Sequence, residues 1–134
     1  MPSLIPKSKS DLETANRAVA AGYPAVKPVL GELVEWLKDY NWPVAHVLAP
    51  FLAKIGIHLV PHIDHVFSTT DETWKYWMIV CLVSRNGDLY EHYKQKLIQY
   101  AEHPSDGDRH QELDQIARQA LDEQGHYQSD QRNL

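Results

Sequence analysis

The sequence predicts an all-α protein: a HEAT-like array of stacked α-hairpins with about seven helices, folded as a single compact domain. Three observations lead to this prediction. Apolar residues recur at helical spacing, and no Asn-Gly or Asp-Gly pair joins two segments of alternating polarity. A helical unit occurs twice at a fixed offset, as in stacked α-hairpins. The 134 residues, 43% of them hydrophobic, are enough to bury one core.

The two clearest copies of the unit begin at Asn41-Trp42-Pro43 and at Thr73-Trp74-Lys75. Placing Gly56 over Gly87 gives an offset of 31 residues. The same offset aligns Leu48 with Ile79, Leu52 with Val83, and Val66-Phe67 with Leu97-Ile98. Two interpretations remain open, a genuine repeat or a helical rhythm that aligns by chance.

The first four helices follow from apolar stripes and from their end signals. They are expected at 11–21 with Ser10 as N-cap, at 24–40, at 43–55 with Asn41 as cap, and at 59–67. Pro28 falls near the start of the second helix, where a missing N–H does little harm. The third is apolar almost all round, which predicts a central position.

Three further helices complete the array. They are expected from a Thr69–Glu72 capping box to Arg85, at 89–103, and at 109–124. Gly87, after Asn86, is expected to act as a C-cap. The fifth helix is apolar on nearly every side from Tyr76 to Val83 and is also expected to be central. Residues 1–125 form the predicted helical-repeat domain, and residues 126–134 form a polar, flexible tail.

The environment expected for this chain is a reducing cytoplasm. The N-terminal segment lacks the apolar stretch of a secretory signal, and the run Tyr76–Val83 is too short to cross a bilayer, so no membrane partner is expected. Cys81 is the single cysteine and lies inside that apolar run. A buried structural thiol is therefore the favoured interpretation.

The charge pattern bears on possible partners. The net charge is −5, and the segment 31–72 alone sums to −4, from six acidic and two basic residues. An acidic chain repels phosphate backbones, so nucleic acid is not an expected partner. A basic, toxin-like protein partner fits this charge, although acidity that only keeps the protein soluble explains the same pattern.

One face of the second helix is acidic. Glu32, Glu35 and Asp39 stand at i, i+3 and i+7 on its exposed side, and Trp36 lies beside its apolar stripe. Such a face is either a solvated surface or a strip that binds a basic ligand. The corner that follows this helix is rich in aromatic residues, which are frequent in binding hot spots. The predicted partner-binding residues are Glu32, Glu35, Trp36, Asp39, Tyr40 and Trp42.

His58, His62 and His65 stand at i, i+4 and i+7 on one face of the fourth helix. Two histidines at i, i+4 can ligate zinc, which makes binding of a metal or a small ligand the alternative function. The Glu of an HExxH motif is absent and no cysteine is near, so solvated or capping histidines are the favoured interpretation. No metal or other cofactor is therefore expected.

Signatures of catalysis are missing. The chain contains no GxSxG, Walker, GxGxxG or Cys/His nucleophile pattern, so it is predicted not to be an enzyme.

Four segments together resemble a bacterial domain-of-unknown-function family. They are Leu4-Ile5-Pro6-Lys7, Gly22-Tyr23-Pro24-Ala25-Val26, Asn41-Trp42-Pro43-Val44-Ala45 and Trp74-Lys75-Tyr76-Trp77. The resemblance covers about residues 4–124 and implies a small, bacterial, cytoplasmic, all-helical protein without site residues that can be carried over. By analogy of fold and charge, it suggests an immunity protein that neutralises a cognate toxin.

Overall fold

A computed structural model describes residues 3–124, and within this range the chain is helical and contains no strand. The all-α, single-domain prediction is confirmed. The α-helices are α1 (Leu12–Ala21), α2 (Leu30–Glu35), α3 (Pro43–Ile55), α4 (Val60–Phe67), α5 (Glu72–Cys81), α6 (Gly87–Glu102), α7 (Asp106–His110) and α8 (Leu113–Glu123). Short 3₁₀ turns join them: η1 (Lys27–Val29), η2 (Trp36–Lys38), η3 (Gly56–Leu59) and η4 (Val83–Arg85).

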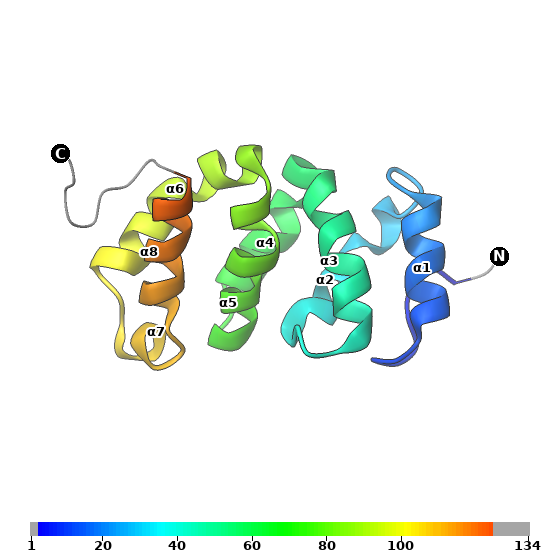
Figure 1. The fold of residues 1–134 in the computed structure, drawn as a ribbon, viewed down its shortest axis with the longest axis horizontal. Coiled ribbons are helices and arrows are strands. Elements are labelled where there is room, and N and C mark those ends of the chain that lie inside the picture. Colours follow the sequence, from blue (N-terminus) through cyan, green and yellow to red (C-terminus); the bar gives the residue numbers. More distant parts are fainter. Residues whose placement is uncertain (1–2, 125–134) are drawn as a thin grey trace.

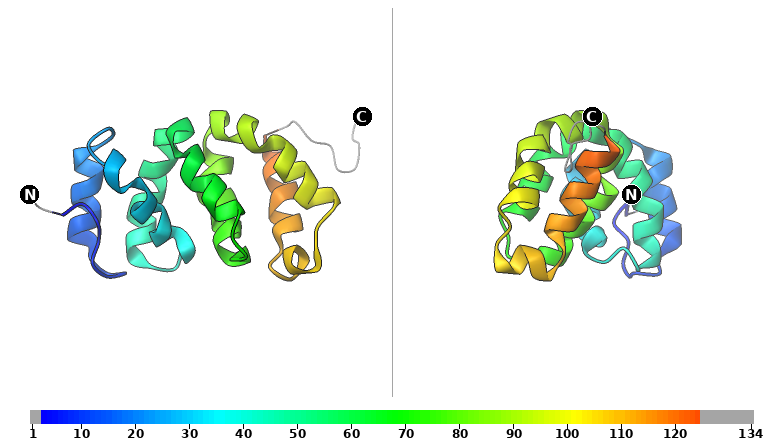
Figure 2. Two further views of the ribbon diagram at one scale, coloured as in Figure 1. Left: turned by 180° about the vertical axis from the view of Figure 1, so that it is seen from behind. Right: turned by 60° about the vertical axis from the view of Figure 1, so that its left-hand side comes forward.

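The helices stack in a row of two layers (Figures 1 and 2). Helices α1, α3, α5 and α8 form one layer, while α2, α4 and α6 form the other. Contacts run along the row from α1 to α3, from α3 to α5 and from α5 to α8, and α2 contacts α4 in the second layer. Helices α1 and α8 therefore lie at opposite ends of the molecule.

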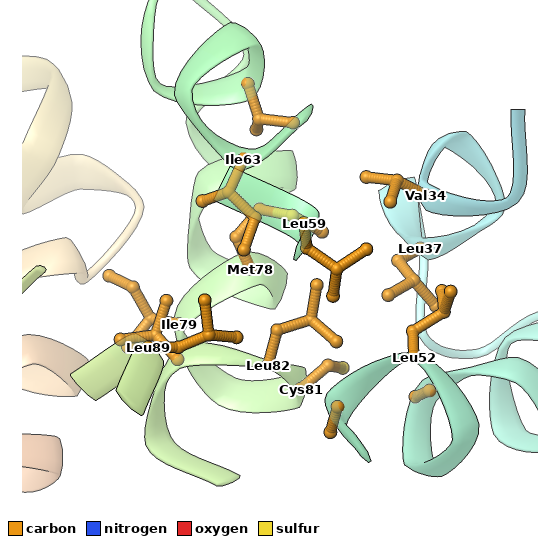
Figure 3. Packing of buried hydrophobic residues seen from close by; sticks show 14 of the residues in the cluster. Val34, Leu37, Leu52, Leu59, Ile63, Met78, Ile79, Cys81, Leu82 and Leu89 are labelled. Carbon is orange, nitrogen blue, oxygen red and sulfur yellow. The ribbon is translucent and has the colours of Figure 1, made fainter. Parts of the chain in front are cut away.

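The core fills the space between the layers (Figure 3). Its labelled residues come from both layers, and most of them are fully buried: Val34, Leu37, Leu52, Leu59, Ile63, Met78, Ile79, Cys81, Leu82 and Leu89. Burying one aliphatic side chain of this size is worth about 2 kcal/mol, so the apolar stripes stabilise the stacking.

Residues that the predicted 31-residue offset pairs are alike in burial. Leu48 and Ile79 are fully buried in α3 and α5 of the same layer, and Val66 and Leu97 are fully buried in α4 and α6 of the other layer. The 31-residue offset read from the sequence thus pairs buried positions of the hairpins α3–α4 and α5–α6, and the repeat itself stays a prediction.

Three predicted caps are wrong. Asp11, rather than Ser10, caps α1, because its Oδ1 accepts from the Thr14 N–H at 3.2 Å. Asp71, rather than Thr69, caps α5 in the same way through the Trp74 N–H at 3.0 Å. Helix α3 begins after Trp42 without a side-chain cap.

Asn86 and Gly87 start α6 instead of ending the preceding helix. The Asn86 Oδ1 accepts from the N–H groups of Asp88 and Leu89 at 2.9 and 3.1 Å. Its Nδ2 donates to the carbonyl of Ala53 near the end of α3 at 2.9 Å. One side chain therefore caps α6 and links it to the preceding hairpin.

Two predicted helices are interrupted, one of them by 3₁₀ turns. The segment 24–40 is α-helical only over α2 and has 3₁₀ turns on both sides. Pro28 stands at the start of the first of these turns, where its missing N–H costs no helical hydrogen bond. The predicted helix 109–124 is broken before Leu113, because Glu112 adopts a left-handed conformation with φ 63°.

One stretch, Pro43–Phe67, is long and apolar enough to cross a membrane by length and composition alone, with a mean hydropathy of 1.5. In the structure it is divided near Gly56, whose φ is 69°, into α3 and α4 of different layers. About half of its most apolar window, 44%, is buried within the protein.

Candidate functional site

Glu32 and Glu35 stand on the outer side of α2, and both are exposed. Neither carboxylate forms a salt bridge or a side-chain hydrogen bond within residues 3–124. We call this pair the acidic ridge. It differs from the other acidic residues near these helices, which have partners inside the fold: Asp64 accepts from the Tyr93 hydroxyl, Asp71 caps α5, and Glu72 pairs with Lys75.

A pocket of about 250 Å³ opens on one side of the acidic ridge. It is lined by residues of α2 and α4 and by Trp74 of α5. Its lining residues are Gly31, Glu32, Val34, Glu35, His62, His65 and Trp74. The structure therefore brings two of the candidate histidines to the same pocket as the two candidate carboxylates.

A second pocket of about 280 Å³ lies on the other side of the acidic ridge. The two glutamates line it together with Trp36, Lys38 and Trp42, and the N-terminal segment closes it with Ile5 and Pro6. The Trp36 and Trp42 rings pack edge to face with centroids 5.6 Å apart. The acidic ridge thus stands between two pockets, each with an indole in its wall.

Trp74 is held firmly in place. Its side chain is 4% exposed, and its Nε1 donates to the carbonyl of Val34 at 3.3 Å. The Lys38 ammonium lies 4.7 Å from the ring centroid, and His65 packs against the ring edge at 6.2 Å. The Trp74 ring therefore already makes a cation–π contact with Lys38.

The structure separates Asp39 and Tyr40 from the acidic ridge. The Asp39 carboxylate accepts from the N–H of Asn41 at 2.8 Å and holds a local turn. Tyr40 stacks on His46 at 4.2 Å and contacts Trp77 at 5.5 Å, so it belongs to the surface of α3 and α5. Of the six predicted residues, Glu32, Glu35, Trp36 and Trp42 lie together.

The three histidines do not form one cluster. His58 stacks on Tyr23 with ring centroids 4.6 Å apart. His62 lies over α2, where a Cβ on Gly31 would come within 3.4 Å of its Nδ1, and His65 contacts Trp74. In the part of the chain that the structure describes, no group of three or more His, Cys, Asp or Glu side chains is placed to hold a metal ion.

Cys81 and Tyr93 lie outside this site, and burial shifts the pKa of both. Burial raises the pKa of the Cys81 thiol to about 12, so the thiol is neutral at physiological pH and a poor nucleophile. Burial and the hydrogen bond to Asp64 raise the pKa of Tyr93 above its usual value. Both groups therefore serve the packing of the protein.

Sequence reasoning missed Trp74 and Lys38 as members of the site. The Trp74 ring lines the first pocket because its Nε1 is hydrogen-bonded to the Val34 carbonyl of α2, a contact that local spacing does not indicate. The only signal for Lys38 in the sequence is its position three residues after Glu35, which places it near the acidic ridge without indicating the Trp74 contact.

No curated protein matches this chain at a significant level. The profile of one family matches residues 4–121, which is most of the 134-residue chain. The chain belongs to the family described as Domain of unknown function (DUF5071).

Proposed function

We propose that this protein is a non-enzymatic binding module that holds a basic protein partner on the acidic ridge and its two pockets. The observation that carries the proposal is the pair Glu32 and Glu35, two exposed carboxylates without a partner in residues 3–124 that stand between indole-walled pockets. Most of the other acidic groups nearby already have internal partners.

The geometry suits a lysine or arginine side chain from the partner. A guanidinium can donate to a carboxylate while its plane stacks on the half-buried indole of Trp36 or Trp42, and both contacts strengthen when water is excluded. Pockets of about 250 and 280 Å³ are smaller than the pockets of about 300–1,000 Å³ that hold drug-sized ligands, but they admit single side chains. A basic toxin neutralised by this protein in the cytoplasm is one partner of this kind, an idea that rests on analogy of fold and charge.

The test begins with purification of the tagged protein from its own host and identification of proteins that co-elute. Binding of the identified partner is then measured by calorimetry for wild type and for Glu32→Lys/Glu35→Lys. Loss of two charge contacts of about 1 kcal/mol each predicts roughly 30-fold weaker binding. Far-UV circular dichroism should be unchanged, because both residues are exposed.

The matched control is Glu13→Lys/Glu123→Lys, which changes two exposed carboxylates on α1 and α8 and gives the same net charge. This control should bind as wild type does. Equal loss in both variants would mean that only net charge matters, and full binding by Glu32→Lys/Glu35→Lys would exclude the acidic ridge as the interface.

The second candidate function is binding of a metal or small ligand at the histidine face. The small-ligand form is favoured, because His62 and His65 line one pocket with the two carboxylates. Stoichiometric zinc in the purified protein, lost in His62→Ala, would support this function. Metal-free protein whose melting temperature does not change on addition of zinc would exclude the metal form.

A further inference from the structure

The layer opposite the acidic ridge carries a groove of about 400 Å³ between α3 and α5, which lie side by side (Figure 1). Ala49 and Ala53 of α3 and Cys81 of α5 line it, and each of these side chains is at most 6% exposed. The hollow exists because alanine side chains end at Cβ where larger residues would fill the space. The floor of the groove is therefore apolar.

Two cations border this apolar floor. Lys54 near the end of α3 and Arg85 in η4 both line the groove, and both are exposed. Neither makes a salt bridge or a side-chain hydrogen bond within residues 3–124. On a protein with a net charge of −5, the groove is thus a local positive site whose two solvent-exposed cations are free to pair with a ligand.

An aromatic wall extends the groove along α5. Tyr40 lines it and contacts Trp77 at 5.5 Å, and Trp77 in turn packs edge to face on Tyr76 at 5.0 Å. Trp77 and Tyr76 also line a neighbouring pocket of about 230 Å³ next to α7. All three rings are half-buried, so part of each is open to solvent. This surface can therefore hold more than one apolar side chain of a ligand.

We propose that the groove between α3 and α5 is a second docking surface, which binds an acidic segment of another protein with apolar side chains along one face. Charge complementarity selects the occupant, because its carboxylates pair with Lys54 and Arg85 while its apolar side chains enter the alanine floor. This surface is separate from the acidic ridge in position and opposite in charge. One protein can then join a basic partner to an acidic one.

The probe is a capped 15-residue helical peptide with leucine at i, i+3, i+4 and i+7 and glutamate beside these positions. It is titrated into the full chain labelled with ¹⁵N, and backbone amide shifts are recorded. The amides of Ala49, Ala53 and Val80 should shift. The same peptide with lysine in place of glutamate should bind at least tenfold more weakly, since it meets like charges at the rim.

The decisive variant is Lys54→Glu/Arg85→Glu, which should weaken binding of the glutamate peptide at least tenfold. Its matched control, Lys9→Glu/Lys27→Glu, has the same net charge and changes two exposed lysines away from the groove. The control and Glu32→Lys/Glu35→Lys should bind the peptide as wild type does.

Four results would overturn the proposal: no amide shifts at millimolar peptide, shifts that map elsewhere, equal binding of the lysine peptide, or unchanged binding by Lys54→Glu/Arg85→Glu. Analytical ultracentrifugation adds one more. A dimer that dissociates in Lys54→Glu/Arg85→Glu would assign the groove to a second copy of this chain instead. None of these results depends on the acidic ridge.

Discussion

Lys75 is a charged residue that the fold buries. Its side chain is 9% exposed, and its ammonium lies 3.3 Å from Glu72 Oε2, one helical turn earlier on α5. A buried ammonium is tolerated when a carboxylate stays close, and breaking such a pair costs more than removing both charges. Replacing only one residue of the pair is therefore expected to destabilise the start of α5.

We predict that Glu72→Gln lowers the free energy of unfolding by about 2 kcal/mol, because the Lys75 ammonium loses its counter-ion in a buried position. The double variant Glu72→Gln/Lys75→Met should recover part of this loss, since no buried charge remains. Chemical denaturation of the single and double variants measures both values. A double variant less stable than Glu72→Gln would contradict the argument.

At the scale of elements, two glycines that the repeat places in equivalent positions have different structural roles. Gly56 ends α3 with a φ of 69°, and a Cβ there would lie 2.8 Å from Asn86 Nδ2. Gly87 begins α6, and a Cβ there would meet nothing within 4 Å. The first position requires glycine and the second does not.

Gly56→Ala should therefore destabilise the protein by about 2 kcal/mol or more, because it forces an L-residue into positive φ and displaces Asn86. Gly87→Ala should be neutral or stabilising by up to about 1 kcal/mol, since alanine favours the helix. Thermal unfolding of both variants gives the comparison. Equal losses would mean that the two glycines are structurally equivalent after all.

Helix positions were predictable because they follow from apolar spacing, whereas several ends were not. Helix α3 was predicted to within its observed bounds, since an apolar stretch follows Pro43 and Gly56 ends it. The break before α8 depends on Glu112 in a left-handed conformation, for which the sequence carries no glycine or asparagine signal. The cap of α6 was misassigned because Asn-Gly marks helix ends as well as helix starts.

At the scale of the whole molecule, the candidate site was predictable only in part. The spacing of Glu32 and Glu35 placed them on one exposed face of a helix, as the structure confirms. Their meeting with His62, His65 and Trp74 depends on how α2 packs against α4 and α5, and that geometry is not encoded in local spacing. The same holds for Tyr40, which turns toward α5.

The row of helices also predicts uneven stability along the molecule. Helix α1 lies at one end and packs on α3, whereas α5 has neighbours on both sides and in the second layer. In stacked arrays end units open more easily than central ones. Amide hydrogen exchange should therefore be faster in α1 than in α5, and mass spectrometry of peptic fragments measures it. Equal protection would indicate that residues 3–124 open as one unit.

The Asn86 side chain couples the stability of the end of α3 to that of the start of α6. Because its oxygen holds the first turn of α6 and its nitrogen holds the Ala53 carbonyl near the end of α3, neither contact can be released by rotating the carboxamide without straining the other. We therefore expect fraying at the end of α3 and fraying at the start of α6 to be coupled. The hairpins α3–α4 and α5–α6 are thus connected by one side chain whose hydrogen bonds to both are interdependent.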